Sequence, residues 1–174
     1  LCRRVIHACR AAGDDHVPRA FGLQVHYHNR KPVPAMIEEE LGATYWEELD
    51  EMVKRVDVLS INCPSTPETF HLMNARRLHL MKPTAVLVNT SRGPIVDQQA
   101  LLDALHGGHI AGAGLDVFEA EPLPRDHPLR SAPRTVLTPH LGYVTRGTYE
   151  VFYGEAVEDV AAWVAGEPIR VIEQ

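Results

Sequence analysis

Residues 84–93 read Thr-Ala-Val-Leu-Val-Asn-Thr-Ser-Arg-Gly, an apolar run of β-forming residues that ends in small polar residues and an arginine. Nearly continuous apolar runs are typical of strands buried on both faces of a parallel sheet. Runs of comparable character recur along the chain and predict five strands in all. They cover residues 23–28, 56–63, 84–89, 113–118 and 135–137.

Helical segments lie between these runs. Three predicted helices cover residues 35–41, 46–55 and 75–81. Asp97 can cap a fourth helix, which stops at Gly107-Gly108. A last helix has an apolar stripe from Tyr149 to Val164. The proline-rich loop 119–134 is long enough to indicate a functional or mobile segment. The alternation of strand and helix predicts an α/β fold with a doubly wound parallel sheet, similar to a Rossmann fold.

Composition excludes several classes of protein. The chain has 174 residues, 45% of them hydrophobic and 23% charged, which suits one globular domain. A net charge of −6 without a basic run gives no reason to expect nucleic-acid binding. No apolar stretch is long enough to span a membrane and no signal peptide opens the sequence, so we expect no membrane contact and a cytoplasmic location. Three cysteines do not indicate a disulfide framework.

Ligands of doubly wound sheets bind beyond the carboxyl ends of the strands. Arg92, Glu121 and His140 each follow a predicted strand. An arginine fork can hold a carboxylate, an imidazole can transfer a proton near neutral pH, and a glutamate can orient an imidazole. Each residue also has a simpler interpretation, namely a surface arginine, a structural histidine and a solvated acidic loop.

A metal site is the alternative that the histidines and cysteines raise. Cys2, His7, Cys9 and His16 match no common zinc spacing. His26 and His28 share one face of a predicted strand, but no further ligand type joins them. The sequence therefore predicts no metal.

Four motifs follow one another along the chain. They are Val56 to Pro64 with Thr66 to Thr69 and Leu72 to Asn74; Met81 to Thr84 with Val88 to Gly93 and Ile95 to Asp97; Ala113 to Phe118 with Glu121-Pro122; and Pro139-His140-Leu141-Gly142. In this order they resemble the motifs of the D-isomer-specific 2-hydroxyacid dehydrogenases. Glu121 follows Arg92 by 29 residues and His140 follows Glu121 by 19, which is similar to the family's spacing. The resemblance extends from about Arg19 to the C-terminus, and Val25-His26-Tyr27-His28-Asn29-Arg30 is most similar to the glyoxylate and hydroxypyruvate reductases.

The resemblance implies an oxidoreductase that transfers hydride between NAD(P)H and a small 2-keto or D-2-hydroxy acid. Arg92 would bind the substrate carboxylate, His140 would protonate the keto oxygen, and Glu121 would hold His140. It further implies a homodimer, although we expect this only of the family. The implied cofactor contacts are Cys63 and Pro64 at the adenosine side, Thr90 and Ser91 at the nicotinamide ribose, Asp116 at the carboxamide, and Gly142 where backbone approaches the cofactor.

The sequence departs from the family at its N-terminus. No G-x-G-x-x-G precedes Phe21, so the backbone cradle for a pyrophosphate is not predicted. Residues 1–18 are unmatched; a helix over Arg3 to Ala12, with no strand before it, is what we expect there. We therefore interpret the chain as N-terminally truncated, with a sheet incomplete at that edge. Residues 19–166 would be a partial dinucleotide-binding domain and 167–174 a tail returning to a missing substrate domain.

Asn29, Arg30 and Lys31 occupy the end of the second strand, where NAD enzymes carry a carboxylate. An amide and two cations would accept a 2′-phosphate, so we predict NADP in preference to NAD. Two other interpretations stay open: a nucleotide-binding or interaction module without turnover, and a truncated gene product.

Overall fold

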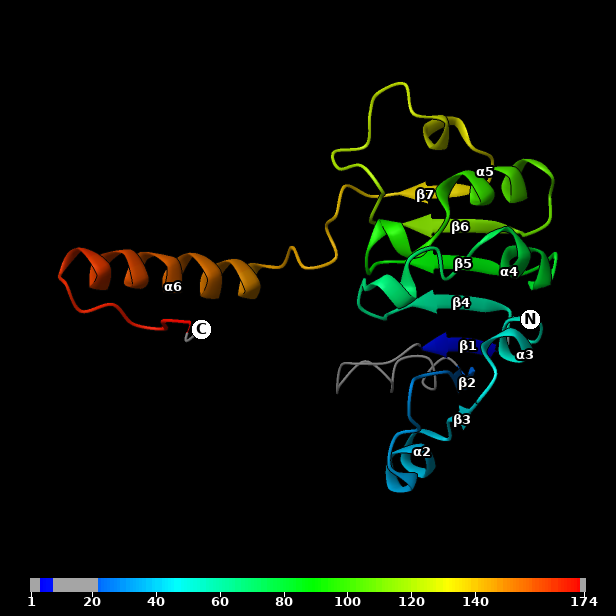
Figure 1. The fold of residues 1–174 in the computed structure, drawn as a ribbon, viewed down its shortest axis with the longest axis horizontal. Helices are drawn as coiled ribbons and strands as arrows, with labels where there is room; N and C mark the ends of the chain where they lie inside the picture. Colours follow the sequence, from blue (N-terminus) through cyan, green and yellow to red (C-terminus); the bar gives the residue numbers. More distant parts are fainter. Residues whose placement is uncertain (1–3, 8–21, 173–174) are drawn as a thin grey trace. The chain divides into compact units, whose positions relative to one another are not determined.

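The computed structural model describes residues 4–7 and 22–172. A seven-stranded sheet has the order β3-β2-β1-β4-β5-β6-β7, and every neighbouring pair is parallel. In Figure 1 the arrows of β4 to β7 therefore end at one common edge. The strand order reverses between β1 and β4, which confirms the predicted doubly wound sheet. The strands are β1 Arg4–His7, β2 Gln24–Tyr27, β3 Thr44–Tyr45, β4 Val58–Ile61, β5 Val86–Asn89, β6 Gly112–Leu115 and β7 Thr135–Leu137.

Helices connect the strands. The predicted helix ends are confirmed at two places: the Asp97 carboxylate accepts a hydrogen bond from the Ala100 amide at 3.0 Å, and Gly108 has a φ of 68°. The helices are α2 Ala35–Leu41, α3 Leu49–Val53, α4 Ala75–Leu80, α5 Gln98–His106 and α6 Arg146–Val164, with short 3-10 turns η1 Pro67–Thr69, η2 Gly93–Ile95 and η3 Pro128–Ser131.

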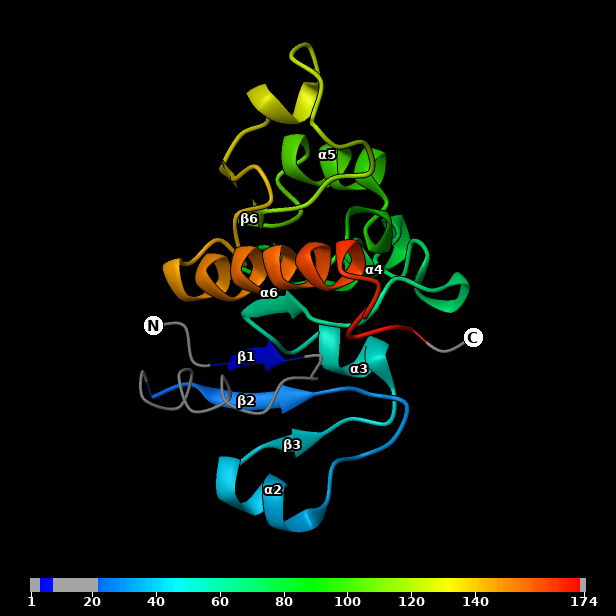
Figure 2. The same ribbon diagram turned by 90° about the vertical axis from the view of Figure 1, so that its left-hand side faces the viewer.

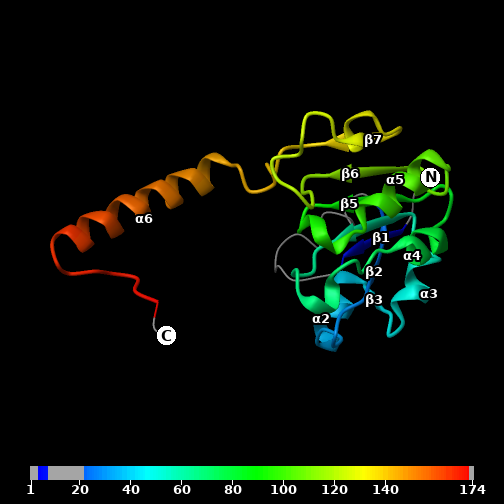
Figure 3. The same ribbon diagram turned by 45° about the horizontal axis from the view of Figure 1, so that its top comes forward.

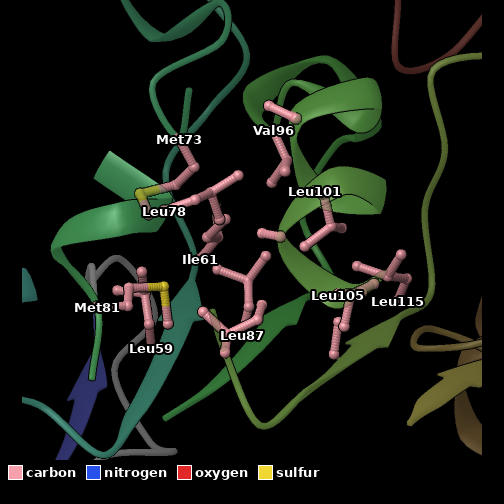
Figure 4. Packing of buried hydrophobic residues seen from close by; sticks show 14 of the residues in the cluster. Leu59, Ile61, Met73, Leu78, Met81, Leu87, Val96, Leu101, Leu105 and Leu115 are labelled. Atoms are coloured by element: carbon pink, nitrogen blue, oxygen red, sulfur yellow. The ribbon is translucent and has the colours of Figure 1, made fainter. Parts of the chain in front are cut away.

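The core lies between the sheet and the helices α3, α4 and α5. Figure 4 shows Leu59 and Leu87 of the strands facing Leu78 of α4 and Leu101 and Leu105 of α5. Along β4 and β5, buried residues alternate with half-buried ones. The continuous apolar runs predicted burial on both faces, whereas the described residues bury one face fully. Dense packing of these leucines holds α4 and α5 against the sheet.

The N-terminal prediction is corrected. Arg4–His7 form β1, which pairs with β2 and β4. At these residues, the prediction of a helix over Arg3 to Ala12 is therefore wrong, and so is the prediction that no first strand is present. Figure 2 shows β1, β2 and β3 side by side, with α2 beyond β3. The sequence also failed to predict β3, and the expected helix 46–55 is shorter because the Trp46 amide donates to the Tyr27 carbonyl at 2.8 Å.

The chain divides into two compact units, Leu1–His140 and Leu141–Gln174. Figures 1 and 3 show α6 as the one helix of the second unit. The predicted helix is present, whereas the predicted single apolar stripe is wrong: Val151 and Trp163 lie on the same helix outside that stripe, and no α6 residue is buried. Among the described residues, no helix is long and apolar enough to cross a membrane.

Candidate active site

The candidate site lies at the carboxyl edge of β5, β6 and β7. Their parallel register aligns Asn89 with Leu115, and Leu115 with Leu137. Arg92, Glu121 and His140 follow these three neighbouring strands. Strand-end reasoning therefore predicted residues that the fold brings to one edge.

Asn89 shapes the turn that carries Arg92. It is 1% exposed; its Oδ1 accepts from the Ser91 amide at 3.0 Å, and its Nδ2 donates to the Arg92 carbonyl at 2.9 Å. The Ser91 hydroxyl donates to the Cys63 carbonyl at 2.5 Å, which ties β5 to the end of β4. Arg92 is exposed, and its Nη1 donates to the Ser91 carbonyl at 2.6 Å. The sequence analysis missed Asn89, although an amide at the end of an apolar run is a signal for a buried hydrogen-bonding residue.

Gly93 lets two loops of the site approach each other. A Cβ at this position would lie 1.9 Å from the carbonyl carbon of Phe118 and 2.4 Å from the Glu119 nitrogen. Only glycine fits against this backbone. The segment that begins at Phe118 leads to Glu121, so the close approach draws Arg92 toward Glu121. The positive charge of Arg92 accordingly contributes to lowering the pKa of Glu121.

Glu121 and His140 lie within hydrogen-bond distance of each other. His140 Nδ1 lies 2.7 Å from Glu121 Oε2, and each side chain is 36% exposed. The Phe118 amide donates to Glu121 Oε1 at 2.9 Å. The hydrogen bond from His140 is the largest cause of a lowered Glu121 pKa; the Phe118 amide and the charges of His140 and Arg92 act in the same direction, against burial. The carboxylate is therefore ionised at neutral pH and faces the imidazole.

The backbone of His140 is held in an uncommon conformation. Its φ is 57°, in the left-handed region that few residues other than glycine adopt. The His140 amide donates to the Asp116 carbonyl at 2.9 Å, and Glu121 holds the ring. Strain of this kind is typical of functional sites, where surrounding contacts maintain it. The positive φ and the contact with Glu121 occur at the same residue, which residue spacing alone could not reveal.

Asp116 is a buried carboxylate beneath this pair. It is 5% exposed, and its Oδ1 accepts from the Thr138 hydroxyl at 2.5 Å, which links the ends of β6 and β7. Thr90, another predicted cofactor contact, is exposed at the end of β5. Both residues thus border the candidate site, while their contacts with a cofactor stay predictions.

The residues predicted for the adenosine side lie farther along the same edge. Asn29, Arg30 and Lys31 follow β2, and Arg30 and Lys31 are exposed. Cys63 is half-buried after β4, which raises the pKa of its thiol, and Pro64 is exposed beside it.

β2 and β5 are three strand spacings apart, or about 14 Å at about 4.8 Å each. An extended dinucleotide covers such a span. Exposed Arg30 and Lys31 follow β2 and Arg92 follows β5, so the residues predicted for the two ends of a dinucleotide lie at separate points of one edge.

Some predictions lie outside this edge. Gly142 belongs to the second unit, so its approach to a cofactor stays a prediction. The segment 8–21 between β1 and β2, where the family's glycine loop would lie, is outside the described residues, and so are the side chains of Cys2, His7, Cys9 and His16. Within the described part, no group of three potential metal ligands occurs.

Comparisons with known proteins agree with this geometry. Residues 16–142 match the profile of the D-isomer specific 2-hydroxyacid dehydrogenase, NAD binding domain. A glyoxylate reductase of Aeropyrum pernix is 46% identical over 151 residues, which are 87% of this chain and 44% of that protein. The chain thus spans less than half the length of this curated relative.

Solved structures give the same result. A crystal structure of a protein from Thermus thermophilus is similar with a TM-score of 0.80 and 40% identity, over 97% of this chain and 53% of the other. A Granulicella formate dehydrogenase is similar with a TM-score of 0.84 and 34% identity, over 96% of this chain and 45% of the other.

Proposed function

Because the chain belongs to the D-isomer-specific 2-hydroxyacid dehydrogenase family, we propose that it supplies the nicotinamide-side residues and the proton donor for NAD(P)H-linked reduction of a small 2-keto acid. The observation that carries the proposal is the 2.7 Å contact between Glu121 Oε2 and His140 Nδ1, with Arg92 on the adjacent strand end. A cation, an imidazole and a carboxylate are the groups that this reaction requires.

Arg92 binds the substrate carboxylate through its planar fork and polarises the neighbouring keto oxygen. A bound nicotinamide supplies the hydride that reduces the keto carbon. His140 gives a proton from Nε2 to the keto oxygen, since Nδ1 contacts Glu121. Glu121 stays ionised and stabilises the protonated imidazole before the transfer. The product is a 2-hydroxy acid, and a proton from solvent restores His140.

The experiment uses a chimera. Residues 22–174 of this chain replace the matching part of the Aeropyrum pernix glyoxylate reductase, which supplies the remaining sequence. We expect NADPH-dependent reduction of glyoxylate and hydroxypyruvate. His140→Ala should lower kcat by on the order of 100-fold or more, because it removes the proton donor. A folded chimera with equal kcat in the alanine variant would contradict the proposed role of His140.

NADP is the cofactor that the adenosine side favours. The Asn29 Oδ1 accepts from the Arg30 amide at 2.9 Å, so the side-chain nitrogen of Asn29 remains as a donor for an anion. Arg30 and Lys31 add two exposed cations, and among residues 29–31 no carboxylate opposes a 2′-phosphate. In the same chimera, a higher kcat/KM with NADH than with NADPH would refute this choice.

A module without turnover is the second candidate function. Its support is the absence of G-x-G-x-x-G from the sequence before Phe21, where the pyrophosphate cradle of the family lies. Titration of the purified 174-residue chain with NADPH tests it: micromolar binding without turnover supports a binding module, whereas no binding supports a gene remnant. A homodimer stays a prediction, to be checked by sedimentation equilibrium.

A further inference from the structure

Two tyrosine hydroxyls hold the turn that follows β2. The Tyr27 hydroxyl accepts from the Val33 amide at 2.9 Å and donates to the Glu38 carboxylate. The Tyr45 hydroxyl donates to the Asn29 carbonyl at 3.2 Å. The two contacts fasten the turn 28–33 near both of its ends.

The tyrosines come from paired strands and pack together. Tyr27 of β2 is opposite Tyr45 of β3, and their ring centroids are 5.3 Å apart. Tyr27 is 3% exposed, whereas Arg30 and Lys31 in the turn are exposed. A buried, hydrogen-bonded base therefore carries an exposed, charged tip, as preorganised binding sites require.

Glu38 of α2 accepts a hydrogen bond from the Tyr27 hydroxyl. Burial, followed by this hydrogen bond, raises the pKa of Tyr27 to about 12. A phenol hydroxyl can donate and accept at once, and this one donates to Glu38 while it accepts from the Val33 amide. α2 is thereby linked to the same turn as the two strands.

We propose that Tyr27 and Tyr45 are positioning residues that hold the Asn29–Lys31 turn in the shape that receives the 2′-phosphate of NADP. The proposal rests on the cofactor choice made above. Neither tyrosine touches the phosphate; each acts through the backbone of the turn. Loss of a hydroxyl should therefore affect a ligand that carries a 2′-phosphate and spare one that lacks it.

The test uses the 174-residue chain and two probes, adenosine 2′,5′-bisphosphate and adenosine 5′-monophosphate, titrated by NMR. Tyr27→Phe keeps the buried ring and removes two hydrogen bonds. Their loss predicts an affinity for the bisphosphate that is lower by about 5- to 30-fold. Affinity for the monophosphate should change less than about twofold, because that probe lacks the 2′-phosphate. Tyr153→Phe, on an exposed position of α6, is the matched control and should change neither affinity.

The outcomes separate this inference from the cofactor choice. If the unaltered chain does not prefer the bisphosphate, the NADP proposal is wrong and the inference with it. If it prefers the bisphosphate and Tyr27→Phe leaves the ratio of affinities unchanged, only the inference is wrong. An equal loss for both probes would show a merely structural role and would also overturn the inference. Tyr45→Phe removes one hydrogen bond and should lower the ratio of bisphosphate to monophosphate affinity about fivefold. This second variant tests the inference if Tyr27→Phe does not fold.

Discussion

Replacement of Gly93 by alanine should separate the two loops that build the site. The new Cβ would lie 1.9 Å from the Phe118 carbonyl carbon and 2.0 Å from its oxygen. Carbon atoms in contact prefer about 3.5 Å or more. The backbones must therefore part by roughly 1.5 Å, and no flexible side chain is available to yield. Overpacking of cores costs about 1–3 kcal/mol, and we expect about 3 kcal/mol because both partners are backbone.

Urea unfolding followed by circular dichroism measures this loss of stability. Gly114→Ala on β6 is the matched control, since its Cβ would meet only Val88 Cγ2 at 3.9 Å, an ordinary contact. It should change the free energy of unfolding by less than about 1 kcal/mol. A Gly93→Ala variant as stable as the unaltered chain would refute the reasoning that glycine is required for the close approach.

Three other changes have defined outcomes. In the chimera, Arg92→Ala should lower kcat/KM by several powers of ten. Arg92→Lys should restore only part of this kcat/KM, because an ammonium lacks the planar fork of a guanidinium. Near-normal kinetics in Arg92→Ala would contradict the role of Arg92. Asp50 pairs with Arg76 and Arg77, which lower its pKa to about 2. This pairing contributes about 1 kcal/mol to the free energy of unfolding above about pH 4, and the contribution disappears as the pH falls toward about 2. In Asp50→Asn, the free energy of unfolding should therefore depend less on pH over that range. The 174-residue chain alone should reduce glyoxylate far more slowly than about one turnover per second, and a faster rate in a spectrophotometric assay would mean that residues 1–18 build a pyrophosphate site.

Periodicity and strand-end reasoning predicted most of the first unit. The five apolar runs became β2 and β4 to β7, and Asp97 caps α5 as expected. The sequence analysis did not predict β1 because Arg4–His7 begins with a basic residue and ends with a histidine, so it contains no long apolar run. β3 has two residues, too few for any period. Short strands are defined by their partners in the sheet, which no local pattern reports.

The site was predicted less completely than the fold. Arg92, Glu121 and His140 follow strand ends, which the sequence shows. The sequence shows neither the 2.7 Å contact between Glu121 and His140 nor the left-handed φ of His140. Asn89 and Gly93 were missed because their roles are contacts across loops. Long-range contacts of this kind become visible only when the strands are in register.

The central claim is that Glu121 and His140 act as one proton-donating unit. The direct measurement is kcat for glyoxylate reduction by the chimera at about pH 7, compared with its Glu121→Gln variant. Glutamine keeps the shape but removes the negative charge that faces the imidazole, so kcat should fall by roughly tenfold or more. A chimera that turns over equally fast in both forms would contradict the claim.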